Sequence, residues 1–174
     1  MRPRPVVRIS AAPRRGFRMR SMPTLLVATV IPGWVGGYPA HASDSIALNG
    51  SYTAISDGNL AQTNYSFHDE QTVTSTWTIS STCSDPMDCT GRVTSDQGWS
   101  ANLRLVGGDL WVVAHDVPNW EKCEDGTSAP GHQTFKFSAD EKLAGWDYTV
   151  GPSGACGANK WLTIEMPFKL VKAG

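Results

Sequence analysis

The sequence predicts an all-β protein: a single small, disulfide-stapled antiparallel domain of about seven or eight strands, built as a β-sandwich or an up-and-down β-barrel. Short runs rich in Thr, Val, Ile and aromatic residues alternate polar and apolar side chains, as half-buried strands do. Turns containing Gly, Pro and Asp separate these runs at short intervals, which is typical of sandwiches and barrels made of neighbouring hairpins. Four cysteines in a chain with an export signal predict the disulfides.

The folded domain is expected to follow an export signal. Residues 1–42 contain seven Arg and no Asp, Glu or Lys, followed by an apolar run at 22–31 and a small-x-small motif at 40–42. This order is typical of a cleavable signal peptide, and the run has about half of the roughly 20 residues that cross a membrane. We expect signal cleavage after residue 42, and a β domain at 43–174 that is secreted or held in the cell envelope, with no membrane span.

The route of export has two interpretations. Arg14 and Arg15, followed by Gly and Phe, resemble a twin-arginine signal, which would mean that the domain folds before export. Translation from Met19 or Met22 would instead leave an ordinary signal for an unfolded chain. Both interpretations predict the same exported domain.

Removing the leader changes the charge of the protein. The whole chain has 15 basic and 16 acidic residues, so subtracting the seven leader arginines leaves eight basic against 16 acidic, a net charge of −8. An acidic surface repels phosphate backbones and anionic lipid. We therefore expect no nucleic-acid partner.

All four cysteines lie in the predicted domain, and four cysteines allow three pairings. We favour Cys83 with Cys89 because these two residues are six apart across a turn. The second pair is then Cys123 with Cys156.

The first strands are predicted from β-prone composition and period-two alternation. A strand at 48–56 ends at an Asp-Gly-Asn turn, and the polar residues 59–71 predict a loop with an irregular strand. At 72–81, apolar residues alternate with Thr and Ser, which predicts a half-buried strand. A turn containing Pro86 then leads to a returning strand at 90–95.

The second half of the chain continues the pattern. A hairpin is predicted from 100–106 and 110–114 around two glycines that can supply the positive φ of a tight turn. Residues 117–131 contain two prolines and one cysteine, so they predict a long loop. The last three strands are expected at 134–138, 143–150 and 161–171. Pro167 predicts that the final strand is an edge strand or carries a bulge.

Six tryptophans fall in the predicted domain. Three of them are in phase with aliphatic neighbours, which predicts core packing: Trp77, Trp111 and Trp146. The other three stand at the starts of strands or loops and are expected to be exposed. Exposed Trp beside polar loops can stack on sugars or bind apolar ligands. The candidate ligand contacts are therefore Trp99, Trp120 and Trp161.

Catalytic signals are weak. His68 precedes Asp69 and a Glu, His115 precedes an Asp, and His132 stands alone. Acid–base or metal chemistry would require these side chains to converge in space. The sequence has no Gly-x-Ser-x-Gly motif, and its cysteines are expected to be paired. We therefore expect no enzyme, cofactor or metal site; a hydrolase using His68, Asp69 or His115 is the less favoured alternative.

Several segments together resemble a known family. They are residues 48–53, 75–83, 88–91, 94–100, 123–135 and 154–157. They resemble small exported mycobacterial proteins of unknown function, and similar segments recur in extracytoplasmic parts of some actinobacterial Ser/Thr kinases. The order of the cysteines is the most specific element. The resemblance implies a secreted, disulfide-bonded β domain and supplies no catalytic residues.

These observations favour a monomeric binding or interaction module. Its ligand would be a component of the cell envelope, such as a glycan or lipid, or a host protein. A barrel that encloses an apolar cavity would favour a lipocalin-like carrier of an apolar ligand. A structural or regulatory envelope protein is the third hypothesis.

Overall fold

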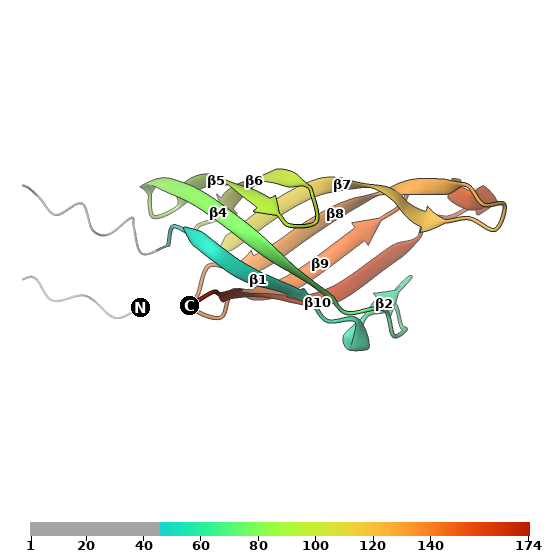
Figure 1. The fold of residues 1–174 in the computed structure, drawn as a ribbon, viewed down its shortest axis with the longest axis horizontal. Coiled ribbons are helices and arrows are strands. Elements are labelled where there is room, and N and C mark those ends of the chain that lie inside the picture. Colours follow the sequence, from blue (N-terminus) through green and yellow to red (C-terminus); the bar gives the residue numbers. More distant parts are fainter. Residues whose placement is uncertain (1–45) are drawn as a thin grey trace, which may run out of the picture. The chain divides into compact units, whose positions relative to one another are not determined.

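The computed structural model describes residues 46–174, and the predicted leader lies outside them. Within these residues, eight antiparallel strands close into a barrel, which decides between the barrel and the sandwich (Figure 1). Their spatial order is β1 (Gly50–Ser56), β4 (Val73–Asp85), β5 (Asp88–Ser95), β6 (Ser100–Val106), β7 (Leu110–Lys122), β8 (Ser128–Ser138), β9 (Ala144–Val150) and β10 (Thr163–Lys172). Pairing of β10 with β1 closes the sheet.

A small hairpin extends the sheet beside β10. It consists of β2 (Gln62–Thr63) and β3 (Ser66–Phe67), and β2 pairs with β10 next to the stretch where β10 pairs with β1. Two short 3₁₀ turns complete the regular structure, η1 (Gly58–Leu60) and η2 (Ala155–Gly157). No helix in residues 46–174 is long and apolar enough to cross a membrane.

Large side chains fill much of the interior of the barrel. Trp77, Trp111 and Phe137 are fully buried, which confirms the core position predicted for both tryptophans. The Trp77 ring meets Phe135 edge to face, with centroids 4.8 Å apart, and packs against Phe168 at 5.3 Å. Replacing such a ring with Ala typically costs 3–5 kcal/mol of stability, because the contacts are lost and a cavity remains. Aromatic packing between β4, β7, β8 and β10 therefore stabilises the core of the barrel.

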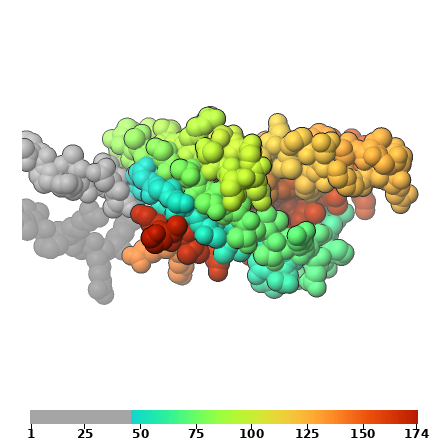
Figure 2. All heavy atoms as spheres, in the orientation of Figure 1, coloured from blue at the N-terminus to red at the C-terminus, as the bar shows by residue number. Residues whose placement is uncertain are grey.

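The prediction of a long loop at 117–131 is wrong. Strand β7 continues to Lys122 and β8 begins at Ser128, so the connection is short. The ladder pairs Val117 with Gly131 and then shifts register before it resumes at Glu121. A bulge of this kind accommodates a proline and a residue with positive φ, here Pro118 and Asn119 (φ 57°). Figure 2 shows the ends of β7 and β8, coloured yellow to orange, projecting beyond the green strands.

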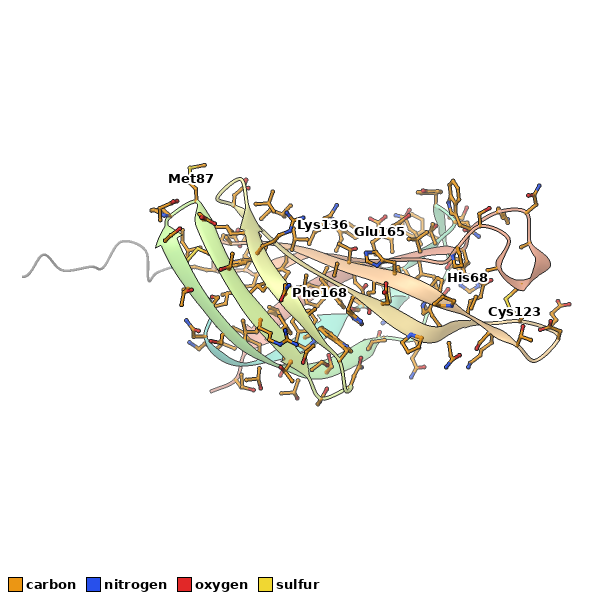
Figure 3. The ribbon with its side chains drawn as sticks, turned by 90° about the horizontal axis from the view of Figure 1, so that it is seen from above. His68, Met87, Cys123, Lys136, Glu165 and Phe168 are labelled. Atoms are coloured by element: carbon orange, nitrogen blue, oxygen red, sulfur yellow. A yellow bond between two sulfur atoms is a disulfide. The ribbon has the colours of Figure 1, made fainter. Side chains whose placement is uncertain are left out.

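Both disulfides join the predicted pairs. Cys83 and Cys89 close the β4–β5 hairpin, and Cys123 joins the β7–β8 tip to Cys156 in η2. Met87, in the β4–β5 turn, and Cys123 lie at opposite ends of the barrel (Figure 3). Each end of the described domain is thus cross-linked.

Strand β10 is not an edge strand, contrary to the expectation from Pro167. This residue pairs with Trp146 of β9 on one side. On its other side, β10 changes partner from β2 to β1 near Pro167, where the Asp57 N–H donates to the Pro167 carbonyl at 2.8 Å. The missing N–H of proline therefore falls where the neighbouring strand is interrupted.

Candidate ligand-binding site

The side chains of β9 face the opposite way from the prediction. Trp146, expected in the core, is 47% exposed, whereas Asp147 is only 1% exposed and Thr149 is buried. Period-two alternation shows that a strand has two faces but does not show which one is inside. The prediction failed because Asp147 finds hydrogen-bond partners inside the barrel, which leaves Trp146 and Tyr148 to the outer face.

The Asp147 carboxylate forms a polar cluster inside the barrel. The Ser56 hydroxyl donates to Oδ2 at 2.7 Å, and Gln133 Nε2 donates to both carboxylate oxygens at 2.8 and 2.9 Å. Burial raises the pKa of Asp147 to about 6, although these hydrogen bonds favour the ionised form. The cluster is enclosed by strands and hydrogen-bonded to them, so it has a structural role in the barrel.

Two of the predicted contact residues pack against the protein itself. Trp99 stacks on His115 with centroids 3.9 Å apart and meets Trp77 edge to face. The Trp120 ring covers Gly131 so closely that a Cβ there would lie 2.8 Å from it. Both tryptophans are half-buried. Their contact with a ligand stays a prediction.

The third predicted contact, Trp161, is 53% exposed. It lines a small hollow of about 80 Å³ together with Asn64 and Glu121. Asn64 belongs to the β2–β3 turn, so this hollow lies beside the hairpin. Its role as a ligand contact likewise stays a prediction.

The three histidines within residues 46–174 do not form a common site. Register places His115 opposite Gln133 and His132 opposite Asp116, so the two imidazoles project from opposite faces of the sheet. His132 Nδ1 lies 2.8 Å from an Asp116 oxygen on the outside, while burial lowers the pKa of His115 on the inside. His68 lies in an exposed segment with its Nδ1 3.1 Å from Glu70, and Asp69 beside it is exposed. Residues 46–174 contain no group of three side chains placed to hold a metal ion.

The outside of the barrel carries exposed aromatic residues beside charged ones. We define the outer aromatic face by six residues of β8, β9, β10 and the β2–β3 hairpin: Tyr65, Phe67, Lys136, Trp146, Tyr148 and Glu165. Its centre is a hollow of about 490 Å³, which is within the usual size of ligand pockets. The lining residues of the hollow are Thr134, Lys136, Trp146, Tyr148 and Glu165.

Strand register explains why these side chains meet. Residues directly opposite each other on paired strands project from the same face. One outer row runs across five strands, through Thr134, Tyr148, Glu165, Gln62 and Phe67. With neighbouring strands about 4.8 Å apart, four steps make this row about 19 Å long. Trp146 lies in the next row, between Lys136 and Pro167.

Opposite charges flank the aromatic rings. Lys136 of β8 and Glu165 of β10, both labelled in Figure 3, lie on the two sides of β9. In the described part of the chain, neither residue forms an ion pair. Partial burial raises the pKa of Tyr148, and the neighbouring Tyr65 hydroxyl and Glu165 carboxylate raise it further. The β2–β3 turn therefore brings Tyr65 to the edge of the hollow.

A second hollow of about 440 Å³ adjoins the first on the outer side of the sheet. His132 and Val150 line it, and each lies two residues along its strand from a residue of the first hollow, Thr134 and Tyr148 respectively. Because side chains two apart project from the same face of a strand, the two hollows lie next to each other on the outer face. The face can thus contact an extended ligand.

The fold has a counterpart among solved structures. The monomer form of the M. tuberculosis PknI sensor domain superimposes with a TM-score of 0.52, covering 74% of this chain and 88% of that chain, at 13% sequence identity. The likeness is one of fold. PknI is a Ser/Thr kinase, so the resemblance to extracytoplasmic segments of such kinases is confirmed at this level. No family model and no curated protein matches the sequence.

Sequence reasoning missed most of the outer aromatic face. The alternation predicts Trp146 in the core, and Tyr65 and Phe67 lie in the polar segment 59–71, for which the sequence predicts a loop with an irregular strand. One signal was present: two large aromatic residues stand in residues 59–71, a stretch with too few aliphatic residues to bury them. Such isolated aromatic residues indicate exposure and are candidates for binding.

Proposed function

We propose that this chain is an extracytoplasmic binding domain of the sensing type, which takes its ligand on the outer aromatic face. The observation that carries the proposal is the exposure of Trp146 and its aromatic neighbours around a preformed hollow. Exposed clusters of large apolar side chains are uncommon on soluble domains and mark interaction sites. The neighbouring fold, described as a sensor domain, supports the same class of function, and the two disulfides suit an oxidising compartment.

The interior of the barrel supports surface binding over lipocalin-like carriage. Trp77, Trp111 and Phe137 occupy the space that an apolar ligand would need. Directly beside the aromatic core, where Asp147 is the cross-strand partner of Phe135, this carboxylate and its hydrogen-bonded partners make part of the interior polar. His115 stacks on Trp99, and His132 contacts Asp116 on the opposite face of the sheet. Because the two imidazoles do not converge on one site, the structure favours a binding function over hydrolysis.

Titration of the purified domain with envelope fractions tests this proposal. A cell-envelope extract is separated into water-soluble glycan, lipid and protein fractions, and binding is measured by calorimetry. We expect at least one fraction to bind, and Trp146→Ala to weaken that binding about tenfold or more, since an aromatic anchor at an interface contributes upwards of about 1.4 kcal/mol.

Met87→Ala is the matched control, because Met87 is also a large exposed apolar side chain but lies in the β4–β5 turn, outside the hollow. This variant is expected to bind like the wild type. Equal binding by the wild type and the Trp146 variant, or no binding by any fraction, would contradict the proposal.

A further inference from the structure

We infer that the ligand of the outer aromatic face is an oligosaccharide and that Tyr65 is a recognition residue for it; this inference rests on the proposed function. Three observations carry it: the occurrence of aromatic rings beside unpaired charges, the two neighbouring hollows along one face, and the strained backbone of Tyr65.

The chemistry of the face matches the two surfaces of a sugar. A pyranose ring has an apolar C–H face, which packs on an aromatic ring, and hydroxyl groups at its edge, which donate and accept hydrogen bonds. Trp146 and Tyr148 provide ring surface, while Lys136 donates hydrogen bonds and Glu165 accepts them. Each of the two surfaces of a sugar thus finds a matching group in one hollow.

Other ligand chemistries fit this face less well. A purely apolar chain would remove Lys136 and Glu165 from water without giving them hydrogen bonds, which costs free energy. A polyanion would meet the Glu165 carboxylate and the acidic surface of the domain, whose predicted residues 43–174 carry a net charge of −8. A neutral polyhydroxylated ligand avoids both penalties.

The length of the face indicates a chain of sugars. The outer row extends about 19 Å across the strands, and the neighbouring hollow at His132 and Val150 lies farther along them. A monosaccharide would cover a fraction of this area. Successive units of an oligosaccharide can contact several of the exposed rings at once.

Tyr65 has a backbone conformation that its side chain disfavours. In the β2–β3 turn, Asn64 has φ 49° and Tyr65 has φ 65°, the left-handed region required at both central positions of a type I′ turn. Gly is the usual residue at the second position, and Tyr is uncommon there. Its side chain is 72% exposed, so packing within the protein does little to offset the strain. Strained, exposed residues of this kind cluster at ligand-binding sites.

The turn is held firmly against β10. The Asn64 N–H donates to the Thr163 carbonyl at 2.9 Å, and the Thr163 N–H donates to the Asn64 side-chain oxygen at 3.1 Å. These two bonds fix the hairpin and leave the Tyr65 ring next to Tyr148. The backbone that carries Tyr65 is therefore already fixed beside the hollow, which reduces the entropy lost when a ligand binds.

Calorimetric titration with purified oligosaccharides tests the inference. The probes are water-soluble gluco-, manno- and arabinogalacto-oligosaccharides, and the variants are Tyr65→Gly, Tyr65→Phe and the control Met87→Ala. We expect at least one probe to bind the wild type and the control equally, and Tyr65→Gly to bind it about tenfold more weakly. Glycine suits the positive φ, so this variant is expected to fold; near-UV circular dichroism checks that it does. Tyr65→Phe keeps the ring and is expected to retain most of the affinity.

The outcomes separate the inference from the proposed function. If no oligosaccharide binds, but lipid vesicles or an envelope protein fraction bind in a manner that requires Trp146, the carbohydrate class is wrong and the binding function stands. If an oligosaccharide binds equally well to the wild type and Tyr65→Gly, the role of Tyr65 is wrong. If no probe or fraction binds, both proposals fail.

Discussion

At the scale of single residues, Asp147 links the sequence to the pH dependence of stability. Its carboxylate is enclosed by the barrel, and burial raises its pKa to about 6 from an ordinary value of 3.8. A carboxyl group whose pKa is raised by folding prefers to be protonated in the folded state. Its contribution to stability is therefore fully present below about pH 4 and is lost as the pH rises through about 6.

We predict that replacing Asp147 with Asn removes this pH dependence. A pKa difference of about two corresponds to about 3 kcal/mol, so the free energy of unfolding of Asp147→Asn, measured relative to the wild type, should rise by up to about 3 kcal/mol between about pH 4 and pH 8. Urea denaturation at several pH values measures it. A difference between the two proteins that stays constant over this range would contradict the burial of an ionisable Asp147.

Trp146 and Asp147 also show what the sequence can predict at a single position. The alternation along 143–150 predicted the strand, and β9 is found at Ala144–Val150. The large apolar residues of that strand are all in phase with Trp146, whereas the other phase holds Gly145, Asp147 and Thr149, so hydrophobicity favours burial of Trp146. The hydrogen bonds from Ser56 and Gln133 to Asp147 come from distant parts of the chain. A local pattern cannot contain that information.

At the scale of elements, the β2–β3 hairpin places Tyr65 in a left-handed backbone conformation, which lowers the stability of the folded state. A left-handed backbone costs an L-residue with a side chain roughly 1–2 kcal/mol, and Gly pays none of this. Gly loses about 0.5–1 kcal/mol more than other residues when the unfolded chain is ordered. The relief of strain therefore equals the entropic loss or exceeds it by about 1 kcal/mol.

We therefore predict that Tyr65→Gly leaves the free energy of unfolding unchanged or raises it by up to about 1 kcal/mol, because the strain is relieved. Tyr65→Ala is the matched comparison, since it also removes the ring but keeps the strain. Chemical denaturation should find the Gly variant more stable than the Ala variant by about 1 kcal/mol. The opposite order would show that Tyr65 does not have a positive φ.

The two disulfides should differ in their effect on stability. Cys123 and Cys156 are separated by 33 residues, whereas Cys83 and Cys89 are separated by six. In the loop-entropy model the longer loop constrains the unfolded chain more, by about 4 kcal/mol against about 2 kcal/mol for the short loop. To compare the two disulfides, each cysteine pair is replaced with serines in turn, and the free energy of unfolding is measured in urea under non-reducing conditions. A larger loss from the Cys83–Cys89 pair would contradict this ranking.

The β7–β8 hairpin shows why element boundaries were harder to predict than element types. Pro118, Pro130 and Cys123 are typical of a loop, and so 117–131 was interpreted as one. In the structure, a bulge accommodates Pro118 and lets the ladder continue. Cross-strand pairing extended the two strands despite unfavourable local residues, because tertiary contacts can override local propensity.

At the scale of the whole molecule, the sequence predicted the all-β class correctly, and closure of the sheet decides which all-β architecture forms. Alternating strands separated by short turns predicted an antiparallel sandwich or barrel, but a repeating pattern of hairpins is common to both. The decision depends on one long-range pairing, between β1 and β10. Because those strands are at opposite ends of the domain sequence, no local motif reveals their contact.

Closure also determines where a ligand can bind. Side chains fill much of the interior, so the polar and aromatic residues available to a ligand lie on the outside. The sequence predicted tryptophans as ligand contacts, namely Trp99, Trp120 and Trp161. In the structure, a different tryptophan lies at the centre of the outer aromatic face. This residue is Trp146, which lies beside Tyr148 of the same strand and beside a charge or tyrosine from each of β8, β10 and the β2–β3 turn.

Binding of a ligand at the outer aromatic face can be followed through the indole N–H resonances of the tryptophans. An ¹⁵N-labelled domain is titrated with the tightest-binding oligosaccharide or envelope fraction. Binding at this face predicts a progressive, saturable shift of the Trp146 indole resonance, while those of Trp99 and Trp120 stay in place. If only the Trp99 and Trp120 resonances shift and that of Trp146 does not change, the ligand binds near these two half-buried tryptophans, and the outer aromatic face is not the binding site.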